Sequence, residues 1–185
     1  MSTETHKILL NSKALDLTLR RLACQLIENH ADFSDCALIG LQPRGSFLLR
    51  RLANILESDY RVANLRHGLL DITFYRDDFR RSDEPLKANS TEIDFVVEGM
   101  NVVIIDDVLY TGRSIRAALT AVQSFGRPNK IELLTLIDRR FSRHLPIQPN
   151  YRGRQVDSIA GQKVVVNWKE NIGEDSVCLI KEKKK

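Results

Sequence analysis

Paired cysteines, long apolar runs and a targeting signal are all missing from this 185-residue sequence. The three cysteines, Cys24, Cys36 and Cys178, are odd in number and widely spaced, which is typical of structural thiols rather than of a disulfide framework or a metal site. No apolar run approaches the roughly 20 residues that span a bilayer, and the N-terminus lacks the basic-then-apolar pattern of a secretory signal. We therefore expect a cytoplasmic protein with no membrane span.

Internal repeats, low-complexity segments and interior linkers rich in Gly, Ser or Pro are absent as well. A large charge excess is also lacking: the net charge is +4, but residues 181–185 hold four lysines and one glutamate, so the preceding 180 residues carry only +1. We interpret 181–185 as a solvated basic C-terminal tail, with a nucleic-acid arm as the alternative. Residues 1–180 are expected to form a single domain.

What the chain does contain is an alternation of helical and strand patterns. Leu15, Leu19 and Leu22 recur at helical intervals behind an N-cap at Asn11 or Ser12. The expected elements are a helix to about residue 29, a strand at 36–41, a helix at 46–57, a strand at 69–75, a strand at 102–105, a helix at 112–125 and a strand at 131–137. The highly charged segment 76–91 has little to bury and predicts a long exposed loop.

The clearest unit is a strand, a helix and a strand in succession. Val102–Ile105 is a continuous apolar run, as expected of a parallel strand buried on both faces. In the following helix, Ile115, Leu119 and Val122 form an apolar stripe, and Gly126 suits its C-terminus. This βαβ unit predicts an α/β fold with a mostly parallel central sheet flanked by helices.

The end of the 102–105 strand carries the candidate site. Two adjacent carboxylates, Asp106 and Asp107, leave the strand, and a turn of small residues then opens a helix. In open α/β sheets, ligands bind beyond the carboxyl ends of the strands. Backbone N–H groups of such a turn bind an anion together with the hydroxyls of Thr111 and Ser114, and Gly112 allows a close approach. We interpret this segment as a phosphate cradle.

The two carboxylates require a different partner, because they would repel a phosphate unless they faced sugar hydroxyls or a Mg²⁺ ion. A sugar phosphate meets both conditions. The alternative is that Asp106 and Asp107 are exposed acids that merely lie near a helix N-terminus. A nucleoside triphosphatase is disfavoured because the chain lacks the pattern G-x-x-x-x-G-K-[ST].

The segment Val102–Ser114 (VVIIDDVLYTGRS) resembles the signature with which type I phosphoribosyltransferases bind 5-phosphoribosyl pyrophosphate (PRPP). Within that superfamily the chain is similar to the PyrR family over roughly residues 7–180. The similarity includes Asp71–Asp78 (DITFYRDD), Asp106–Arg113, and Leu145-Pro146-Ile147 followed by Tyr151. It implies the type I phosphoribosyltransferase fold, with a flexible lid loop and a small hood, and a homodimer or a higher homo-oligomer.

The resemblance also implies roles at the matching positions around PRPP. Asp106 and Asp107 bind the ribose hydroxyls, and bind Mg²⁺ mainly through the substrate. Arg44 and Gly45 correspond to the loop that holds pyrophosphate, although a lone arginine such as Arg44 is more often a surface side chain. The implied 5′-phosphate site consists of Leu109, Tyr110, Thr111, Gly112, Arg113 and Ser114.

Two further regions follow from the same resemblance. Residues 75–87 correspond to the lid that closes over the reacting centre, with Arg76 as a catalytic residue and Arg80 assisting it. Asp138 and Arg139 lie where the family builds its base pocket.

The implied activity is the conversion of uracil and PRPP to UMP and pyrophosphate, through a transition state that resembles an oxocarbenium ion. Mg²⁺ neutralises the leaving pyrophosphate. Tyr110 favours a pyrimidine, because related purine enzymes place an aspartate there and a tyrosine, with an ordinary pKa of about 10, does not accept a proton at neutral pH. The alternatives are a transferase for a purine base or orotate, and a nucleotide-sensing RNA-binding regulator with weak or absent catalysis.

PyrR proteins also regulate pyrimidine genes, which implies pyrimidine-operon mRNA as a partner. The candidate RNA contacts are Arg20, Arg21 and Arg143, and residues 139–154 hold five arginines and one histidine with no acid. A solvated loop rim is the alternative for this stretch. Cys24 replaces a histidine typical of the family's first helix, and 139–143 departs from the usual Asp-Arg-Gly-His-Arg pattern. Both departures lie where RNA contacts are expected.

Overall fold

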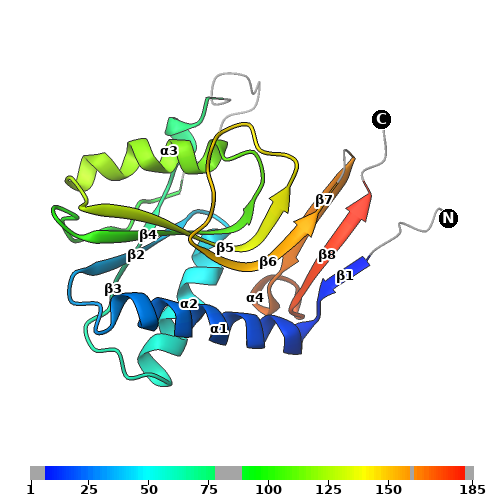
Figure 1. Cartoon of the computed structure of the whole chain (residues 1–185), viewed down its shortest axis with the longest axis horizontal. Helices are drawn as coiled ribbons and strands as arrows, with labels where there is room; N and C mark the ends of the chain where they lie inside the picture. The colour runs from blue at the N-terminus through cyan, green and yellow to red at the C-terminus, as the bar shows by residue number, and fades with distance from the viewer. Residues whose placement is uncertain (1–6, 78–88, 159–160, 182–185) are drawn as a thin grey trace.

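The protein has a central sheet of five parallel strands with helices on both faces, and a second sheet of three antiparallel strands at one end (Figure 1). The computed structural model describes residues 7–77, 89–158 and 161–181. Its elements are β1 (Lys7–Leu10), α1 (Ser12–His30), β2 (Cys36–Leu41), α2 (Gly45–Ser58), β3 (Arg66–Leu70), η1 (Thr73–Tyr75), β4 (Asn101–Leu109), α3 (Arg113–Val122), η3 (Gln123–Phe125), β5 (Lys130–Arg140), β6 (Tyr151–Asp157), β7 (Gln162–Asn167), α4 (Lys169–Ile172) and β8 (Ser176–Lys181).

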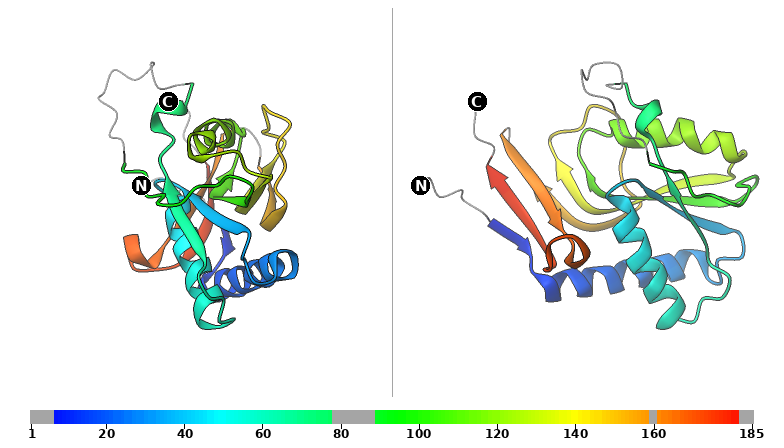
Figure 2. Two further views of the ribbon diagram at one scale, coloured as in Figure 1. Left: turned by 90° about the vertical axis from the view of Figure 1, so that its left-hand side faces the viewer. Right: turned by 180° about the vertical axis from the view of Figure 1, so that it is seen from behind.

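The strand order of the large sheet is β3-β2-β4-β5-β6, and that of the small sheet is β1-β8-β7. Helices α1 and α2 lie on one face of the large sheet and α3 on the other (Figure 2). The small sheet, which carries the short helix α4, is the hood. The predicted α/β class, with its parallel sheet and hood, is confirmed.

The two faces of the sheet explain the apolar runs of the central strands. Every residue of β2 is buried, and in β4 Ile105 packs with α1 and α2 while Ile104 packs with α3. Successive side chains of a strand point to opposite faces, so a strand covered on both sides needs no polar alternation. At about 25 cal/mol per Å² of apolar surface removed from water, these strands carry much of the stability.

The first helix begins where the sequence predicts. The Oδ1 atom of Asn11 accepts a hydrogen bond from the Ala14 amide at 2.9 Å, which caps α1, and the helix ends at His30. Helix α2 and strand β2 also match their predicted positions within a residue.

The predicted strand at 69–75 is wrong from Asp71 onwards, and the observed strand begins earlier, at Arg66. Strand β3 ends at Leu70, and a 3₁₀ turn over Thr73–Tyr75 follows. The buried carboxylate of Asp71 causes the break, because its Oδ1 accepts hydrogen bonds from the backbone amide of Thr73 at 3.1 Å and from its hydroxyl at 2.6 Å. A side chain that binds the backbone two residues ahead favours a turn over continued strand.

Two strands extend past their predicted ends, and one helix stops early. Strand β4 continues to Leu109 because it stays paired with β5, so Asp106 and Asp107 lie within the strand rather than after it. For the same reason Asp138 and Arg139 belong to β5. Helix α3 ends at Val122 and is followed by a 3₁₀ turn.

Arg51 is one of the side chains that join the hood to the main body. Arg51 of α2 binds the carboxylates of Glu170 and Asp175, each through an N–O pair 2.7 Å long, and its guanidinium carbon lies 4.8 Å from the centre of the Trp168 ring. Trp168 is itself buried and stacks on Phe47. The hood is therefore held against the same helix whose N-terminus faces the candidate site.

Parts of two predictions lie outside the described residues. The predicted lid at 75–87 is described only to Asp77, and Arg80 lies in the omitted segment 78–88. Of the predicted tail, Lys181 is the last residue of β8, where it pairs with Gln162, and residues 182–185 are not described. No helix in the described part of the chain is long and apolar enough to cross a bilayer.

Candidate active site

The turn between β4 and α3 encloses a hollow of about 230 Å³. Gly112 is the N-cap of α3 and adopts a φ of 90°, a left-handed conformation that suits glycine. The hollow is lined by Arg76, Asp106 and Val108 together with the turn residues Leu109, Tyr110, Thr111, Gly112, Arg113, Ser114 and Ile115. All six residues predicted to bind the 5′-phosphate are thus brought together at the N-terminus of a helix, where an anion is favoured.

The loop that follows β5, residues 141–150, supports this turn. The amide of His144 donates to the Thr111 carbonyl at 3.0 Å. A side chain at Gly112 would lie 3.2 Å from Cδ1 of Ile147, so the glycine also makes room for the loop. The motif Leu145-Pro146-Ile147 was part of the family resemblance without a role, and its packing against Gly112 supplies one.

The two adjacent carboxylates are partly withdrawn from water with few partners. Asp107 is buried, and its Oδ2 has no hydrogen-bond partner among the residues that the structure describes. One oxygen of Asp106 accepts the Asp107 amide at 3.0 Å. Burial raises the pKa of Asp106 well above its ordinary value, and the charge of Asp107 raises it further, while Arg44 and Arg76 oppose the shift. Burial likewise raises the pKa of Asp107, opposed by Arg44.

The raised pKa values mean that ionising Asp106 and Asp107 in the folded protein costs more free energy than ionising an exposed aspartate. A carboxylate that lacks donors in a protein interior is stabilised by hydroxyl or cationic ligands that supply them. The described residues include no cluster of three or more His, Cys, Asp or Glu side chains arranged to hold a metal. The carboxylate oxygens of Asp106 and Asp107 can therefore accept hydrogen bonds from sugar hydroxyls. They also suit a divalent cation, provided that the cation brings other oxygen ligands with it.

The N-terminus of α2 lies against the same strand. A Cβ atom on Gly45 would collide with the carbonyl oxygen of Ile105 and would lie 3.3 Å from Cα of Asp106. The missing side chain thus lets the helix begin directly beside the carboxylates. Arg44 is the N-cap residue, and its charge acts on both aspartates. The predicted pair Arg44–Gly45 therefore does reach the site, with the positive end of a 14-residue helix behind it.

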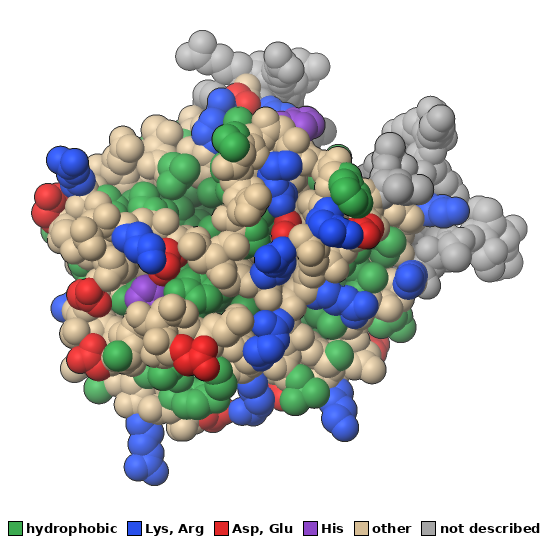
Figure 3. Space-filling model, viewed as in Figure 1, with side chains coloured by type: hydrophobic (Ala, Val, Ile, Leu, Met, Phe, Trp, Pro, Cys, Tyr) green, Lys and Arg blue, Asp and Glu red, His purple; other side chains and the backbone are tan. Residues whose placement is uncertain are grey.

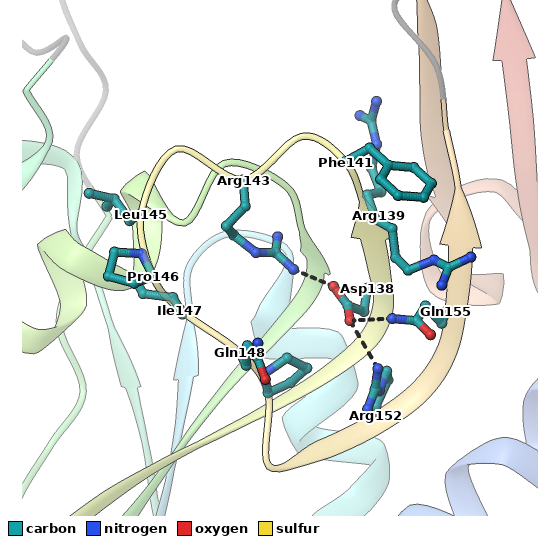
Figure 4. Close-up of a pocket in the computed structure, with 12 residues that line it drawn as sticks. Asp138, Arg139, Phe141, Arg143, Leu145, Pro146, Ile147, Gln148, Arg152 and Gln155 are labelled. Carbon is teal, nitrogen blue, oxygen red and sulfur yellow. Dashed lines mark hydrogen bonds and ion pairs between the residues drawn. The ribbon is translucent and has the colours of Figure 1, made fainter.

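Asp138 and Arg139, predicted to build the base pocket, both line a cavity of about 560 Å³ but have different partners (Figure 4). Arg139 is buried, donates to the Ser158 hydroxyl at 2.8 Å and to the Gln162 carbonyl at 2.7 Å, and so reaches the hood. Its guanidinium carbon lies 3.9 Å from the centre of the Tyr110 ring.

Asp138 instead faces the loop that follows β5. Its carboxylate is paired with Arg143, with Arg152 at 3.4 Å and with the amide of Gln155 at 3.5 Å. Arg143 also donates to the Tyr110 carbonyl. Arg152 and Gln155 were not predicted, because they come from β6 and only the sheet pairing brings them beside β5.

The three arginines predicted to contact RNA are not brought together. Arg20 pairs with Asp16 at 3.0 Å and with Asp59 of α2 at 2.5 Å. Arg21 points the other way and donates to the carbonyls of Arg152 and Gly153. Arg143 lies at the Asp138 cavity. Lys and Arg side chains nevertheless form a band across the face seen in Figure 3.

The fold and the turn define a class of protein. Residues 6–171 match the family described as the phosphoribosyl transferase domain. The hypoxanthine phosphoribosyltransferase of Trypanosoma cruzi superposes with a TM-score of 0.71 over 96% of this chain and 97% of that one, at 16% identity. The protein is a phosphoribosyltransferase.

Curated relatives narrow the class. "Bifunctional protein PyrR" of Picosynechococcus sp. is 43% identical over 94% of this chain and 96% of that protein. The PyrR proteins of Elusimicrobium minutum and Enterococcus faecalis are 38% and 36% identical over similar spans. The chain belongs to the PyrR family.

Proposed function

We propose that the protein transfers the 5-phosphoribosyl group of PRPP to a nitrogen of uracil, giving UMP and pyrophosphate. The observation that carries the proposal is the meeting of Asp106 and Asp107 with two helix N-termini at the carboxyl end of β4. One helix start, the turn before α3, suits the 5′-phosphate, and the other, at Gly45, suits the pyrophosphate. The ribose between them would place its hydroxyls against the two carboxylates.

The raised pKa values of the aspartates support this assignment. Two ribose hydroxyls that donate to the carboxylates would supply the partners that the free site lacks, so substrate binding relieves a cost already present in the fold. In the reaction the bond from the anomeric carbon to pyrophosphate breaks and a bond to the uracil nitrogen forms. The carboxylates then face the positive charge that develops on the ribose ring.

Arg44 and Arg76 are assigned to the leaving group. Arg44 precedes the helix start beside the carboxylates, and Arg76 lines the phosphate hollow with Asp106. Both would offset negative charge that accumulates on the departing pyrophosphate. A Mg²⁺ ion bound with PRPP would neutralise part of the same charge. The protein's own contribution to that ion is Asp106 and Asp107, acting mainly through the sugar and pyrophosphate oxygens.

The base is assigned to the region where Arg139 meets Tyr110. A tyrosine next to the ribose site lacks the carboxylate that a purine enzyme would use, which favours uracil. No side chain is assigned as a general base, because uracil has an acidic N–H and a pocket that binds its anion suffices. Asp138 would act as the partner that fixes Arg143 and so the backbone of Tyr110.

The experiment that tests the activity supplies PRPP, Mg²⁺ and, separately, uracil, orotate, hypoxanthine, guanine or xanthine, and follows nucleotide and pyrophosphate. Product from uracil alone, lost in the Asp106→Asn/Asp107→Asn double variant, supports the proposal. The matched control is Asp35→Asn, because the Asp35 carboxylate binds Asn101 at the opposite end of β4. Preference for another base would retain the PRPP site and overturn the argument from Tyr110.

A second function, binding of pyrimidine-operon mRNA, is favoured by the family and by the band of basic side chains in Figure 3. The candidates Arg20, Arg21 and Arg143 each have partners within the chain, so RNA would compete with Asp59, with backbone carbonyls and with Asp138. Affinity for a transcript of the operon leader, measured at several salt concentrations, tests this function. Each lost phosphate contact should reduce the salt slope by about 1, so Arg20→Gln and Arg21→Gln identify which of these arginines takes part.

A further inference from the structure

Asp77, just before the omitted segment, is tied to α3. Its Oδ1 accepts a hydrogen bond from Nε of Arg113 at 2.9 Å, and its Oδ2 lies 2.7 Å from Nη2 of Arg116. The two arginines are three residues apart on α3 and so share one face of the helix. Both hold the pKa of Asp77 below its usual range, mainly through the hydrogen bond from Arg113. One carboxylate thus joins the stretch that ends at residue 77 to the helix that follows the phosphate turn.

A second carboxylate, that of Asp71, contacts described residues that precede and follow 78–88. Asp71 accepts the Thr73 amide and hydroxyl with Oδ1 and the Asn89 amide at 3.0 Å with Oδ2. The amide of Asp71 in turn donates to the Thr91 hydroxyl at 3.1 Å. Because Asn89 and Thr91 come later in the chain than residues 78–88, Asp71 joins the end of β3 to the stretch that begins at residue 89.

Arg76 lies between these two attachments. The turn over Thr73–Tyr75 packs beside α3, and Arg76 follows it directly. Its side chain lines the phosphate hollow with Asp106 and lowers the pKa of that carboxylate. The path from Asp71 to Asp77 is only six residues, so fixing both ends restricts where the arginine can go.

We propose that Asp77 is a positioning residue for the transferase reaction: its bridge to Arg113 and Arg116 holds Arg76 over the phosphate hollow. The side chain of Arg113 then serves the bridge, while its backbone belongs to the turn. Arg116 takes no part in lining the hollow, so its contribution runs through Asp77. This inference rests on the proposed transferase activity and extends it to Asp77 and Arg116, which lie outside the PRPP signature.

The ion pairs are too exposed to act mainly through stability. The side chains of Asp77, Arg113 and Arg116 are 39%, 42% and 48% exposed, and ion pairs this open to solvent add little to folding stability. Placement is a different matter, because a shift of about 1 Å in a group that acts on the reacting atoms can cost on the order of 100-fold in rate. Loss of Asp77 should therefore change turnover much more than melting temperature.

The test is a double-mutant cycle on UMP formation. Asp77→Asn and Arg116→Gln are each expected to lower kcat/KM about 10-fold, and Asp77→Glu to restore part of the loss. In an Arg76→Gln background, Asp77→Asn should add little, because the group it positions is already gone. Asp59→Asn is the matched control, since it breaks a similarly exposed pair with Arg20 away from the site and should leave kcat/KM unchanged.

Hydrogen exchange of residues 72–77 gives a readout that does not depend on activity. Asp77→Asn should speed exchange there, and Asp59→Asn should not. An active wild type in which Asp77→Asn has no effect, or an equal effect with and without Arg76, overturns the inference and leaves the proposed function standing. A wild type that forms no UMP overturns the proposed function instead, and unchanged exchange in Asp77→Asn then overturns the bridge as well.

Discussion

The guanidinium of Arg139 lies over the ring of Tyr110, with 3.9 Å between the guanidinium carbon and the ring centre. Such a contact is worth about 0.5–2 kcal/mol, depending on exposure. It links the hood, through the Gln162 carbonyl, to the turn that carries the phosphate site. The ring rather than the hydroxyl makes this link, so the two parts of Tyr110 have separable roles.

Tyr110→Phe is expected to keep kcat/KM for uracil within about threefold of wild type, because the ring that holds Arg139 remains. Tyr110→Ala is expected to lower it at least 10-fold. Steady-state kinetics with uracil and PRPP distinguish the two variants. Equal losses in both would assign the role to the hydroxyl.

Asp106→Asn and Asp107→Asn are expected to stabilise the fold while abolishing activity. Both carboxyl groups have raised pKa values in the folded protein, so the folded state binds protons more tightly than the unfolded chain. The wild type therefore loses stability as pH rises through those values. Asparagine removes this cost at pH 7–8, where each kcal/mol gained should raise Tm by about 2–4 °C.

The gain should shrink as pH falls towards the ordinary aspartate pKa of 3.8 and vanish below it, because the wild-type groups are then protonated in the folded and the unfolded state alike. Thermal melts of wild type and variants from pH 4 to pH 8 provide the measurement. An increase in Tm that is the same at every pH would show that the substitution acts by some means other than charge.

Gly45→Ala is expected to reduce PRPP affinity and to destabilise the protein by about 1–3 kcal/mol, as overpacking does. The added methyl would collide with the Ile105 carbonyl and push α2 away from the carboxylates. Calorimetric titration with PRPP, together with urea denaturation, measures both effects. Gly99→Ala is the control: Gly99 has a φ of 69° and open space around its Cα, so alanine there adds backbone strain without a collision. PRPP affinity equal in the two variants would contradict the packing argument.

A buried network at the other end of the sheet predicts acid sensitivity. Glu132 lies 2.8 Å from Nε2 of His30, 2.6 Å from Nζ of Lys130 and 3.1 Å from the hydroxyl of Tyr151. Burial alone would raise the pKa of Glu132, but the hydrogen bonds from Lys130 and Tyr151 hold it below its usual range. Hydrogen bonds to a charged group each contribute about 1.5–3 kcal/mol, so Glu132→Gln should melt below wild type at pH 7.

The sign of the pH dependence follows from the lowered pKa. The network stabilises the fold above the ordinary glutamate value of 4.5 and is lost as pH falls through the folded value. The melting temperatures of wild type and Glu132→Gln should therefore converge as pH falls below the ordinary glutamate value of 4.5. A constant difference down to pH 3 would mean that the network is held by hydrogen bonds that do not depend on the charge of Glu132.

Local patterns were enough to predict much of this protein. The apolar run Val102–Ile105, the stripe of α3 and the Asn11 cap depend on residues within a turn or two of each other, and the structure confirms all three. The phosphate turn and its two aspartates could be predicted for the same reason, because they are contiguous in the chain. The identity of these residues and their order along one strand and helix already define the PRPP signature.

Contacts between distant segments could not be predicted in this way. Pairing with β5 extends β4 through Asp106 and Asp107. Helix α2 can begin beside them because Gly45 has no Cβ to collide with the Ile105 carbonyl. The second oxygen of Asp71 binds the amide of Asn89, 18 residues away. Arg20 and Arg21 are neighbours in sequence but meet Asp59 and Gly153 on different elements. The sequence specifies short-range periodicity directly, whereas the partner of a buried charge depends on which segments the folded core brings into contact.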